Sequence, residues 1–239
     1  DVFAQVMNQY AAQLGMTGSN FRNASGMPDE DHYTTARDMA TLARAIINEF
    51  PEYYRWYSVK EFEYNGIKQP NRNSLLWRDE SVDGMKTGRT DEAGYCLVSS
   101  AQRDDMRVIS VVLGTASAKA RIDGSHSLLN YGFRFFETRL LYRAGETVAT
   151  AKIWKAAKET TPLGLPEDLY VTIPRGSFEE VESVLNIPET LLAPIAHGQP
   201  IAELQVSLNG DQLLNMPLRA LEDNPDGSFW QRAIDGVTL

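Results

Sequence analysis

The run Lys86-Thr87-Gly88-Arg89 holds the side chains of this sequence that are best suited to chemistry. It follows Val82-Asp83-Gly84-Met85, and it lies at the end of a strand predicted over residues 83–87. At an open strand edge, a lysine ammonium and a threonine hydroxyl can bind a carboxylate, and unpaired strand N–H groups can donate to an oxyanion. The glycine lets a ligand approach the backbone closely. We therefore predict a carboxylate-binding site; the alternative is a solvated lysine in a surface turn.

Two arginines elsewhere are candidates for the same site. Arg72 lies in a polar loop before the apolar residues Leu75-Leu76-Trp77, and Arg121 lies near the start of a predicted helix. Because a cation near a helix N-terminus opposes the helix dipole, Arg121 is expected to have an anionic partner. The alternative for either arginine is a surface salt bridge, which is the commoner case.

Other reactive side chains favour ordinary structural roles. Asp29-Glu30-Asp31-His32 matches neither a calcium loop nor a zinc motif, so we expect a solvated loop there. Cys96 lies in the apolar stretch Tyr95-Cys96-Leu97-Val98, where a buried and unreactive thiol is expected. The sequence predicts no metal site and no cofactor.

The composition excludes several classes of partner. The 239 residues include 23 lysines and arginines against 32 aspartates and glutamates, and the net charge is −9. These charges are spread along the chain, so we expect no broad cationic surface for nucleic acid. No apolar run approaches the roughly 20 residues that a membrane-spanning helix needs.

The carboxylate-binding run is predicted to lie in an antiparallel sheet flanked by helices. Apolar residues at helical spacing predict helices at residues 1–14, 35–50 and 117–131. Alternating residues predict a hairpin at 61–67 with Asn65-Gly66 at its tip, and strands at 83–87, 94–101 and 107–114. Short polar connections make the last three strands a meander, and the very apolar third strand is expected to be covered on both faces. The fold class of this part is α+β.

The pattern changes near residue 140. Beyond it, short alternating stretches such as 169–173 and 201–208 are separated by Pro-Arg-Gly and Asn-Gly-Asp turns. Evenly spaced short strands of this kind predict a small all-β sandwich or barrel. We therefore expect two domains, residues 1–140 and residues 141–239.

Several segments, in the same order, resemble a known family. The segment from Val82 to Thr90, followed by Ala93-Gly94-Tyr95-Cys96-Leu97-Val98, resembles the third active-site motif of the low-molecular-mass penicillin-binding proteins. These are serine D-alanyl-D-alanine carboxypeptidases of the penicillin-binding protein 5/6 type. Residues 34–40, 71–77 and 132–137 resemble further segments of that family, and so does the β-rich tail. The resemblance covers essentially the whole chain.

The resemblance implies acyl transfer on peptidoglycan stem peptides that end in D-Ala-D-Ala. In the family, the serine of a Ser-x-x-Lys motif attacks the amide, and a Ser-x-Asn motif assists proton transfer. On the matching positions here, Lys86 and Thr87 would bind the terminal carboxylate, and the N–H of Arg89 would form half of the oxyanion hole. Arg72 and Arg121 match basic residues that the family places around the carboxylate. β-Lactams would acylate the same serine.

The sequence departs from the family pattern in two motifs and at its end. It contains no Ser-x-x-Lys, and Ser207-Leu208-Asn209, which fits Ser-x-Asn, lies in the β-rich tail and is interpreted as a chance match. No catalytic residue is therefore expected in this chain, and the nucleophile is expected upstream. The helical apolar stripe that starts in the first turn favours the same hypothesis. The last residues, 235–239, are expected to lack the amphipathic membrane-surface helix of relatives.

Three functions stay open. The favoured one is a serine D-Ala-D-Ala carboxypeptidase, which would lie in the periplasm and be tethered to the inner membrane by a carboxyl-terminal anchor. The second is a non-catalytic peptidoglycan-binding scaffold that keeps the carboxylate site. The third is a β-lactamase of the same superfamily, which the long β-rich second domain disfavours.

Overall fold

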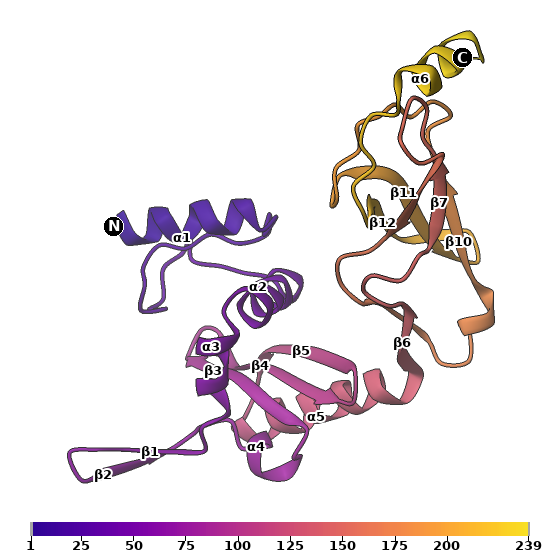
Figure 1. Ribbon diagram of the computed structural model, residues 1–239. Helices are drawn as coiled ribbons and strands as arrows, with labels where there is room; N and C mark the ends of the chain where they lie inside the picture. Colours follow the sequence, from indigo (N-terminus) through magenta and orange to yellow (C-terminus); the bar gives the residue numbers. More distant parts are fainter. Residues whose placement is uncertain (1, 239) are drawn as a thin grey trace. The chain divides into compact units, whose positions relative to one another are not determined.

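The computed structural model describes residues 2–238, except for the side chains of residues 233, 234 and 236–238 (Figure 1). The chain divides into two units, residues 1–135 and residues 136–239. The boundary predicted near residue 140 lies inside β6 (Phe136–Tyr142), the first strand of the second unit.

The first unit is built around a three-stranded antiparallel sheet. Its strands are β3 (Val82–Thr90), β4 (Gly94–Arg103) and β5 (Met106–Thr115), in the order β3-β4-β5. Tight polar turns join them, as the sequence predicted. Among the described residues β3 pairs only with β4, so the strand that carries Lys86 lies at an edge of the sheet.

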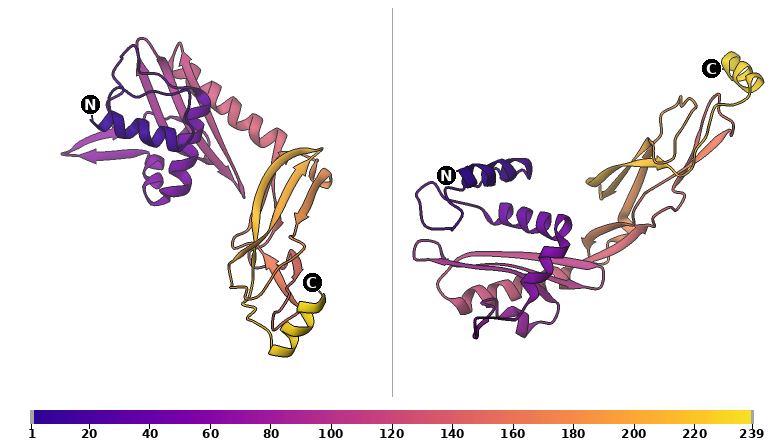
Figure 2. Two further views of the ribbon diagram at one scale, coloured as in Figure 1. Left: turned by 90° about the horizontal axis from the view of Figure 1, so that it is seen from above. Right: turned by 60° about the vertical axis from the view of Figure 1, so that its left-hand side comes forward.

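Helices cover both faces of this sheet. Figure 2 shows α2 (Ala36–Glu49) on one side and α5 (Ala118–Phe135) on the other. The α2 helix begins where the Thr35 hydroxyl accepts a hydrogen bond of 3.1 Å from the Asp38 N–H, which is an N-cap that satisfies one free donor. Its Ala43 packs in one buried cluster with Tyr54, Met85 and Val98.

The prediction that the third strand of the meander is covered on both faces is confirmed only in part. Helices α2 and α5 both contact β5, and Gly132 of α5 lies directly against Val108. However, most side chains of β5 are only half-buried. The reason is that β5 is the second edge of the described sheet, so neighbouring strand side chains shield it from one side only.

Shorter elements complete the first unit. They are α1 (Val2–Gln13), α3 (Pro51–Tyr54), the 3-10 helix η1 (Arg55–Ser58), β1 (Glu61–Tyr64), β2 (Ile67–Pro70) and α4 (Leu75–Arg78). The tip of the β1–β2 hairpin is confirmed, because Asn65 and Gly66 have positive φ angles of 51° and 73°. Two such residues form the turn that matches the twist of a hairpin.

The second unit is all-β apart from short helical turns and its last helix. A two-stranded sheet pairs β6 with β9 (Leu169–Pro174). A five-stranded sheet has the order β10 (Val181–Asn186), β11 (Pro200–Leu208), β12 (Asp211–Ala220), β8 (Thr160–Gly164) and β7 (Ala149–Lys152), with the 3-10 helix η2 (Phe178–Glu180) before β10. Side chains of both sheets share one apolar core, including Val171, Leu204 and Leu218. This confirms the predicted small β domain.

Two local features of the second unit bear on the sequence analysis. Ser207-Leu208-Asn209 lies at the β11–β12 turn, where the Asn209 amide donates to Glu180 over 2.8 Å. Our prediction that the chain ends without a helix is wrong, because α6 (Phe229–Thr238) follows the last strand and includes most of residues 235–239. No helix within residues 2–238 is long and apolar enough to cross a membrane.

Candidate functional site

The candidate site lies on the edge strand β3, whose two halves differ in burial. The half that precedes Lys86 is largely buried beneath η1 and α4, whereas the half from Lys86 to Thr90 is largely exposed. Ligand access is therefore confined to the second half of the strand. This is the half that the sequence analysis selected for carboxylate binding.

Lys86 and Thr87 lie on opposite faces of the sheet at this edge. Lys86 is paired with Val98, which belongs to the α2 core, and Thr87 is paired with Leu97. Directly paired residues share a face of an antiparallel sheet. The Lys86 ammonium donates a hydrogen bond of 2.6 Å to the carbonyl oxygen of Thr87. Because β3 is an edge strand, a ligand lying along it can meet both side chains.

Arg121 lies beneath Gly88 of β3. Its side chain is buried, and its Nη1 donates to the carbonyl oxygens of Gly88 over 3.1 Å and Cys96 over 3.4 Å. Its guanidinium also lies 5.5 Å from the ring centre of Tyr95. The anionic partner that we expected is replaced in this structure by two backbone carbonyls. The buried Nε atom of Arg121 has no hydrogen-bond partner, which leaves one donor of the guanidinium unsatisfied.

Arg89 directs its charge away from the middle of the strand. Its guanidinium forms a 2.8 Å ion pair with Asp91 and lies 5.0 Å from the ring centre of Tyr95. The ion pair is exposed, so it restrains the side chain only weakly. What Arg89 can offer a ligand at the edge is therefore mainly its backbone.

The loop that carries Arg72 is fixed to β3 by its neighbours. The Asn73 side chain is fully buried and donates a hydrogen bond of 3.0 Å to the carbonyl oxygen of Gly84. The Asn71 amide donates to the carbonyl oxygen of Val59 over 3.1 Å. Arg72 itself is exposed, and no hydrogen bond or ion pair joins it to Lys86 in the described part of the chain. The structure thus places Arg72 on a loop that Asn73 anchors to β3.

The burial of the Cys96 side chain differs from our prediction. We predicted a buried thiol, but the side chain is only partly buried. The β4–β5 register shifts between Tyr95 and Leu97, so Cys96 has no partner on β5. Its sulfur instead contacts the Ala93 carbonyl oxygen at 3.4 Å and the Gly114 N–H at 3.5 Å. A bulge of this kind cannot be seen in an apolar run.

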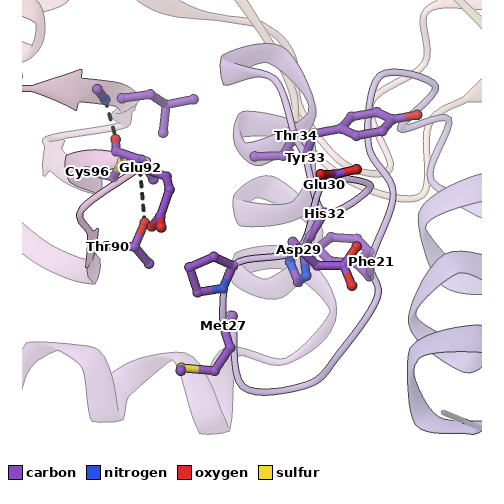
Figure 3. Close-up of a pocket in the computed structure, with 15 residues that line it drawn as sticks. Phe21, Met27, Asp29, Glu30, His32, Tyr33, Thr34, Thr90, Glu92 and Cys96 are labelled. Atoms are coloured by element: carbon purple, nitrogen blue, oxygen red, sulfur yellow. Dashed lines mark hydrogen bonds between the residues drawn. The ribbon is translucent and has the colours of Figure 1, made fainter.

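A cavity of about 830 Å³ adjoins the exposed end of β3. Thr90, Glu92 and Cys96 line one side of it, and the loop of residues 21–34 lines the other (Figure 3). The acidic cluster lies in that loop and is exposed, as predicted. Asp29 and Glu30 of this cluster line the cavity, which we did not predict from the sequence.

Comparisons with known proteins found matches to two families. Residues 1–117 match the family described as D-alanyl-D-alanine carboxypeptidase, and residues 136–225 match the family described as penicillin-binding protein 5, C-terminal domain. The chain is also 31% identical, with a TM-score of 0.63, to the crystal structure of the D-alanyl-D-alanine carboxypeptidase DacD from Francisella tularensis, covering 94% of this chain and 68% of that one. The chain belongs to the D-alanyl-D-alanine carboxypeptidase family.

Other members of this carboxypeptidase family are more similar in sequence. The chain is 40% identical to D-alanyl-D-alanine carboxypeptidase DacA of Escherichia coli (strain K12), over 100% of this chain and 60% of that protein. It is 40% identical, with a TM-score of 0.81, to penicillin binding protein 5 from Haemophilus influenzae, covering 94% of this chain and 66% of that structure. The chain spans about 60% of the length of the first curated relatives that it matches.

We did not predict one polar network of this chain from the sequence. The Tyr54 hydroxyl donates to Asp83 over 2.7 Å, and Arg107 donates to Asp83 over 2.8 Å and to Ser100 over 2.7 Å. Burial raises the pKa of the Tyr54 hydroxyl, so it stays a hydrogen-bond donor. The network fixes the buried half of β3, three residues before Lys86. No spacing in the sequence links residues 54, 83 and 107, because three different elements supply them.

Proposed function

We propose that the protein is a serine-type D-Ala-D-Ala carboxypeptidase that removes the terminal D-alanine from peptidoglycan stem pentapeptides. The observation that carries this proposal is the exposed Lys86-Thr87-Gly88-Arg89 half of an edge strand, with Arg121 buried directly behind it. The family to which the chain belongs supports the reaction class. We also propose that the nucleophilic serine lies upstream of this chain, because no Ser-x-x-Lys occurs within it.

In this proposal, β3 binds the carboxyl end of the substrate. The Lys86 ammonium and the Thr87 hydroxyl hold the terminal carboxylate, which would compete with the Thr87 carbonyl oxygen for the ammonium. Arg121 and Arg72 add positive charge around this carboxylate. The unpartnered Nε of Arg121 supports a role for an anion here, since a bound anion could attract a donor that is otherwise unsatisfied.

The proposed reaction is acyl transfer in two steps. The serine oxygen attacks the carbonyl carbon between the two D-alanines, and the backbone N–H of Arg89 donates to the oxyanion that develops. The amide bond breaks, an ester to the serine forms, and D-alanine leaves with the proton taken from the hydroxyl. Water then cleaves the ester. This route needs no metal ion and no cofactor.

The proposed partners and location follow from the same reaction. β-Lactams resemble the dipeptide, so we expect them to acylate the same serine. Peptidoglycan lies outside the cytoplasm, and we place the protein in the periplasm, tethered to the inner membrane. The exposed aromatic rings of Phe229 and Trp230 at the start of α6 support contact with a membrane surface.

Labelling with a fluorescent penicillin, followed by denaturing electrophoresis, tests the proposal on the full-length protein. A stable label that forms at a serine upstream of this chain, together with release of D-alanine from an acylated tripeptide, is the expected result. Rapid loss of the label would instead indicate a β-lactamase. No label on intact, folded protein would favour a non-catalytic peptidoglycan-binding scaffold.

A further inference from the structure

The strand β10 forms one edge of the five-stranded sheet in the second unit. It pairs with β11 along its whole length without a shift in register. In the described part of the chain, no hydrogen bond joins residues 182–186 to an element other than β11. Because the backbone polar groups of alternate strand residues point to opposite sides, β10 presents a row of unpaired N–H and C=O groups. An extended peptide can pair with such a row.

The β10 edge has few of the features that keep natural edge strands from pairing. Such strands usually carry a lysine or a proline, contain a bulge, or are covered by another element. β10 contains no lysine and no proline, and its pairing with β11 shows no bulge. Its side chains are mostly exposed, including the apolar Val184 and Leu185 at 49% and 38%. The edge is therefore open to an extended partner.

The charge around this edge is negative. Residues 176–218, which cover β10, β11 and most of β12, contain no lysine and no arginine. A second copy of the chain at the same edge would bring carboxylates against carboxylates, which disfavours pairing between two copies. A basic partner is attracted instead. The carboxylates of the segment are those of Glu179, Glu180, Glu182, Glu189, Glu203 and Asp211.

One face of β10 combines this charge with an apolar side chain. Alternate residues of a strand share a face, so Glu182, Val184 and Asn186 project from the same side of the sheet. Leu185 is paired with the fully buried Leu204 and therefore points to the opposite side, toward the core. The face with Glu182 is the outer face of the sheet.

A second carboxylate lies on this outer face at the other end of β10. Asn186 is paired with Glu203 of β11, so Glu182 and Glu203 flank the exposed Val184. Four residues of strand separate them along β10, which is roughly 13 Å. Within the described part of the chain neither carboxylate forms an ion pair, and Glu203 accepts a hydrogen bond of 3.4 Å from Asn215.

A cavity of about 610 Å³ adjoins the Asn186 end of β10. Proline rings and aliphatic side chains supply most of its lining, and Glu203 is the charged residue among those that line it. The register of β11 with β12 shifts between Pro200 and Ala202, which both line the cavity. A lysine or arginine side chain fits this combination, because its aliphatic stem can cover apolar surface while its charged end reaches the carboxylate.

We propose that the β10 edge binds an extended segment of a partner protein in which an apolar residue lies between two basic residues, each two positions away from it. Paired with β10, the segment places its apolar residue beside Val184 and its basic residues at Glu182 and at the cavity beside Glu203. Backbone hydrogen bonds supply the affinity, and the carboxylates select the sequence. This site lies in the second unit and takes no part in the proposed carboxypeptidase reaction.

The test measures binding of labelled peptides to the full-length protein by fluorescence anisotropy. The main probe has the core Lys-Thr-Val-Thr-Lys, and a second peptide has glutamate in place of both lysines. Two further peptides are N-methylated versions of the main probe, one at the valine and one at the second threonine. Consecutive N–H groups of a strand point to opposite sides, so only one of these two methyl groups can remove a hydrogen bond to β10.

A double variant removes the proposed charges, and a matched double variant is its control. Glu182→Gln/Glu203→Gln should raise the Kd of the lysine peptide by about threefold to tenfold, as expected for two exposed ion pairs. Glu159→Gln/Glu167→Gln should leave the Kd unchanged, since these exposed residues flank β8 and lie outside the cavity. In roughly 1 M salt, where the Debye length falls to about 3 Å, the effect of the first variant should shrink. Unchanged melting temperatures show that both variants are folded.

The expected result is that the lysine peptide binds, that the glutamate peptide binds more weakly, and that one N-methylated peptide loses binding while the other keeps it. Three results would overturn the inference: no binding at about 1 mM lysine peptide, equal affinities for the lysine and glutamate peptides, or equal affinities for the two N-methylated peptides. A dimer of the protein that excludes the peptide would also overturn it, because the edge would then pair with a second copy. None of these readouts uses enzymatic activity, so failure of the proposed function gives a separate result, the absence of a penicillin label.

Discussion

The buried side-chain amide of Asn73 donates a hydrogen bond of 3.0 Å to the carbonyl oxygen of Gly84, two residues before Lys86. This contact connects the loop that carries Arg72 to the strand that carries Lys86. The buried amide of Asn73 thus helps to set the relative placement of the two proposed cationic groups.

We expect Asn73→Ala to weaken both the fold and the proposed site. The substitution leaves the buried carbonyl of Gly84 without its partner, which costs about 1–3 kcal/mol in the free energy of unfolding. Freed from β3, the loop should also hold Arg72 less well, so penicillin acylation should slow even under conditions where the variant is folded. Chemical denaturation and labelling rates measure the two effects.

The matched control for this prediction is Asn186→Ala, at an exposed position of β10 in the other unit. It should change neither quantity. If Asn73→Ala proved as stable as the unmodified protein, the hydrogen bond to Gly84 would have no structural importance.

Lys86→Ala should slow acylation without unfolding the protein. The ammonium is exposed, and its described hydrogen bond is to the adjacent Thr87 carbonyl, so little stability depends on it. As the main cation for the proposed substrate carboxylate, its loss should reduce the second-order rate of acylation by about tenfold or more. Lys68→Ala on β2 is the control, since Lys68 is exposed and β2 belongs to a different sheet from β3. An unchanged acylation rate in Lys86→Ala would show that Lys86 does not bind the carboxylate.

Gly88→Ala should slow acylation without lowering the stability of the protein. A Cβ atom at this position would lie 3.8 Å from the Cβ of Cys96, an ordinary contact, so the melting temperature should stay nearly constant. The added methyl group would project from the same face of β3 as Lys86, where the proposed ligand would lie, and acylation should fall by roughly tenfold.

Gly84→Ala should behave in the opposite way. There a Cβ atom would lie only 2.6 Å from the Tyr54 hydroxyl oxygen, and such overpacking costs about 1–3 kcal/mol. A large loss of stability in Gly88→Ala, or none in Gly84→Ala, would contradict the described packing of β3.

The stability of the first unit should depend on pH, because the Asp79 carboxyl has a lowered pKa in the folded protein. Burial by itself raises the pKa of this carboxyl, but hydrogen bonds from Ser81 and the ion pair with Arg103 outweigh it and hold the pKa below its ordinary value of 3.8. A carboxyl whose pKa is lowered by folding stabilises the protein above its unfolded pKa, and this stabilisation is lost as the pH falls through the folded pKa.

Asp79→Asn should therefore destabilise the protein at neutral pH, and the difference from the unmodified protein should shrink below about pH 4. Urea unfolding across a pH series measures it. Asp105→Asn, in the exposed turn between β4 and β5, should show no such dependence. A difference that is constant with pH would mean that the charge of Asp79 is not the cause.

Local patterns were enough to predict the elements around the site. The Asn65-Gly66 turn, the three strands of the meander and the helix after them follow from turn residues and side-chain periodicity, which act over a few residues. The α6 helix was missed, because a short amphipathic segment at the end of a β-rich region gives a weak local signal. The bulge at Cys96 was missed because it depends on the register with a second strand.

The sequence by itself determined the residues of the proposed carboxylate-binding site, because the Lys86-Thr87-Gly88-Arg89 run and its strand are local features. Only the tertiary structure decided that β3 lies at an edge, that one half of it is buried, and that Arg121 supports Gly88 from behind. It alone also placed Glu30 and Glu92 on opposite sides of one cavity (Figure 3). The physical reason is that exposure, hydrogen-bond partners and cavities arise from contacts between residues far apart in the chain, which no spacing along it encodes.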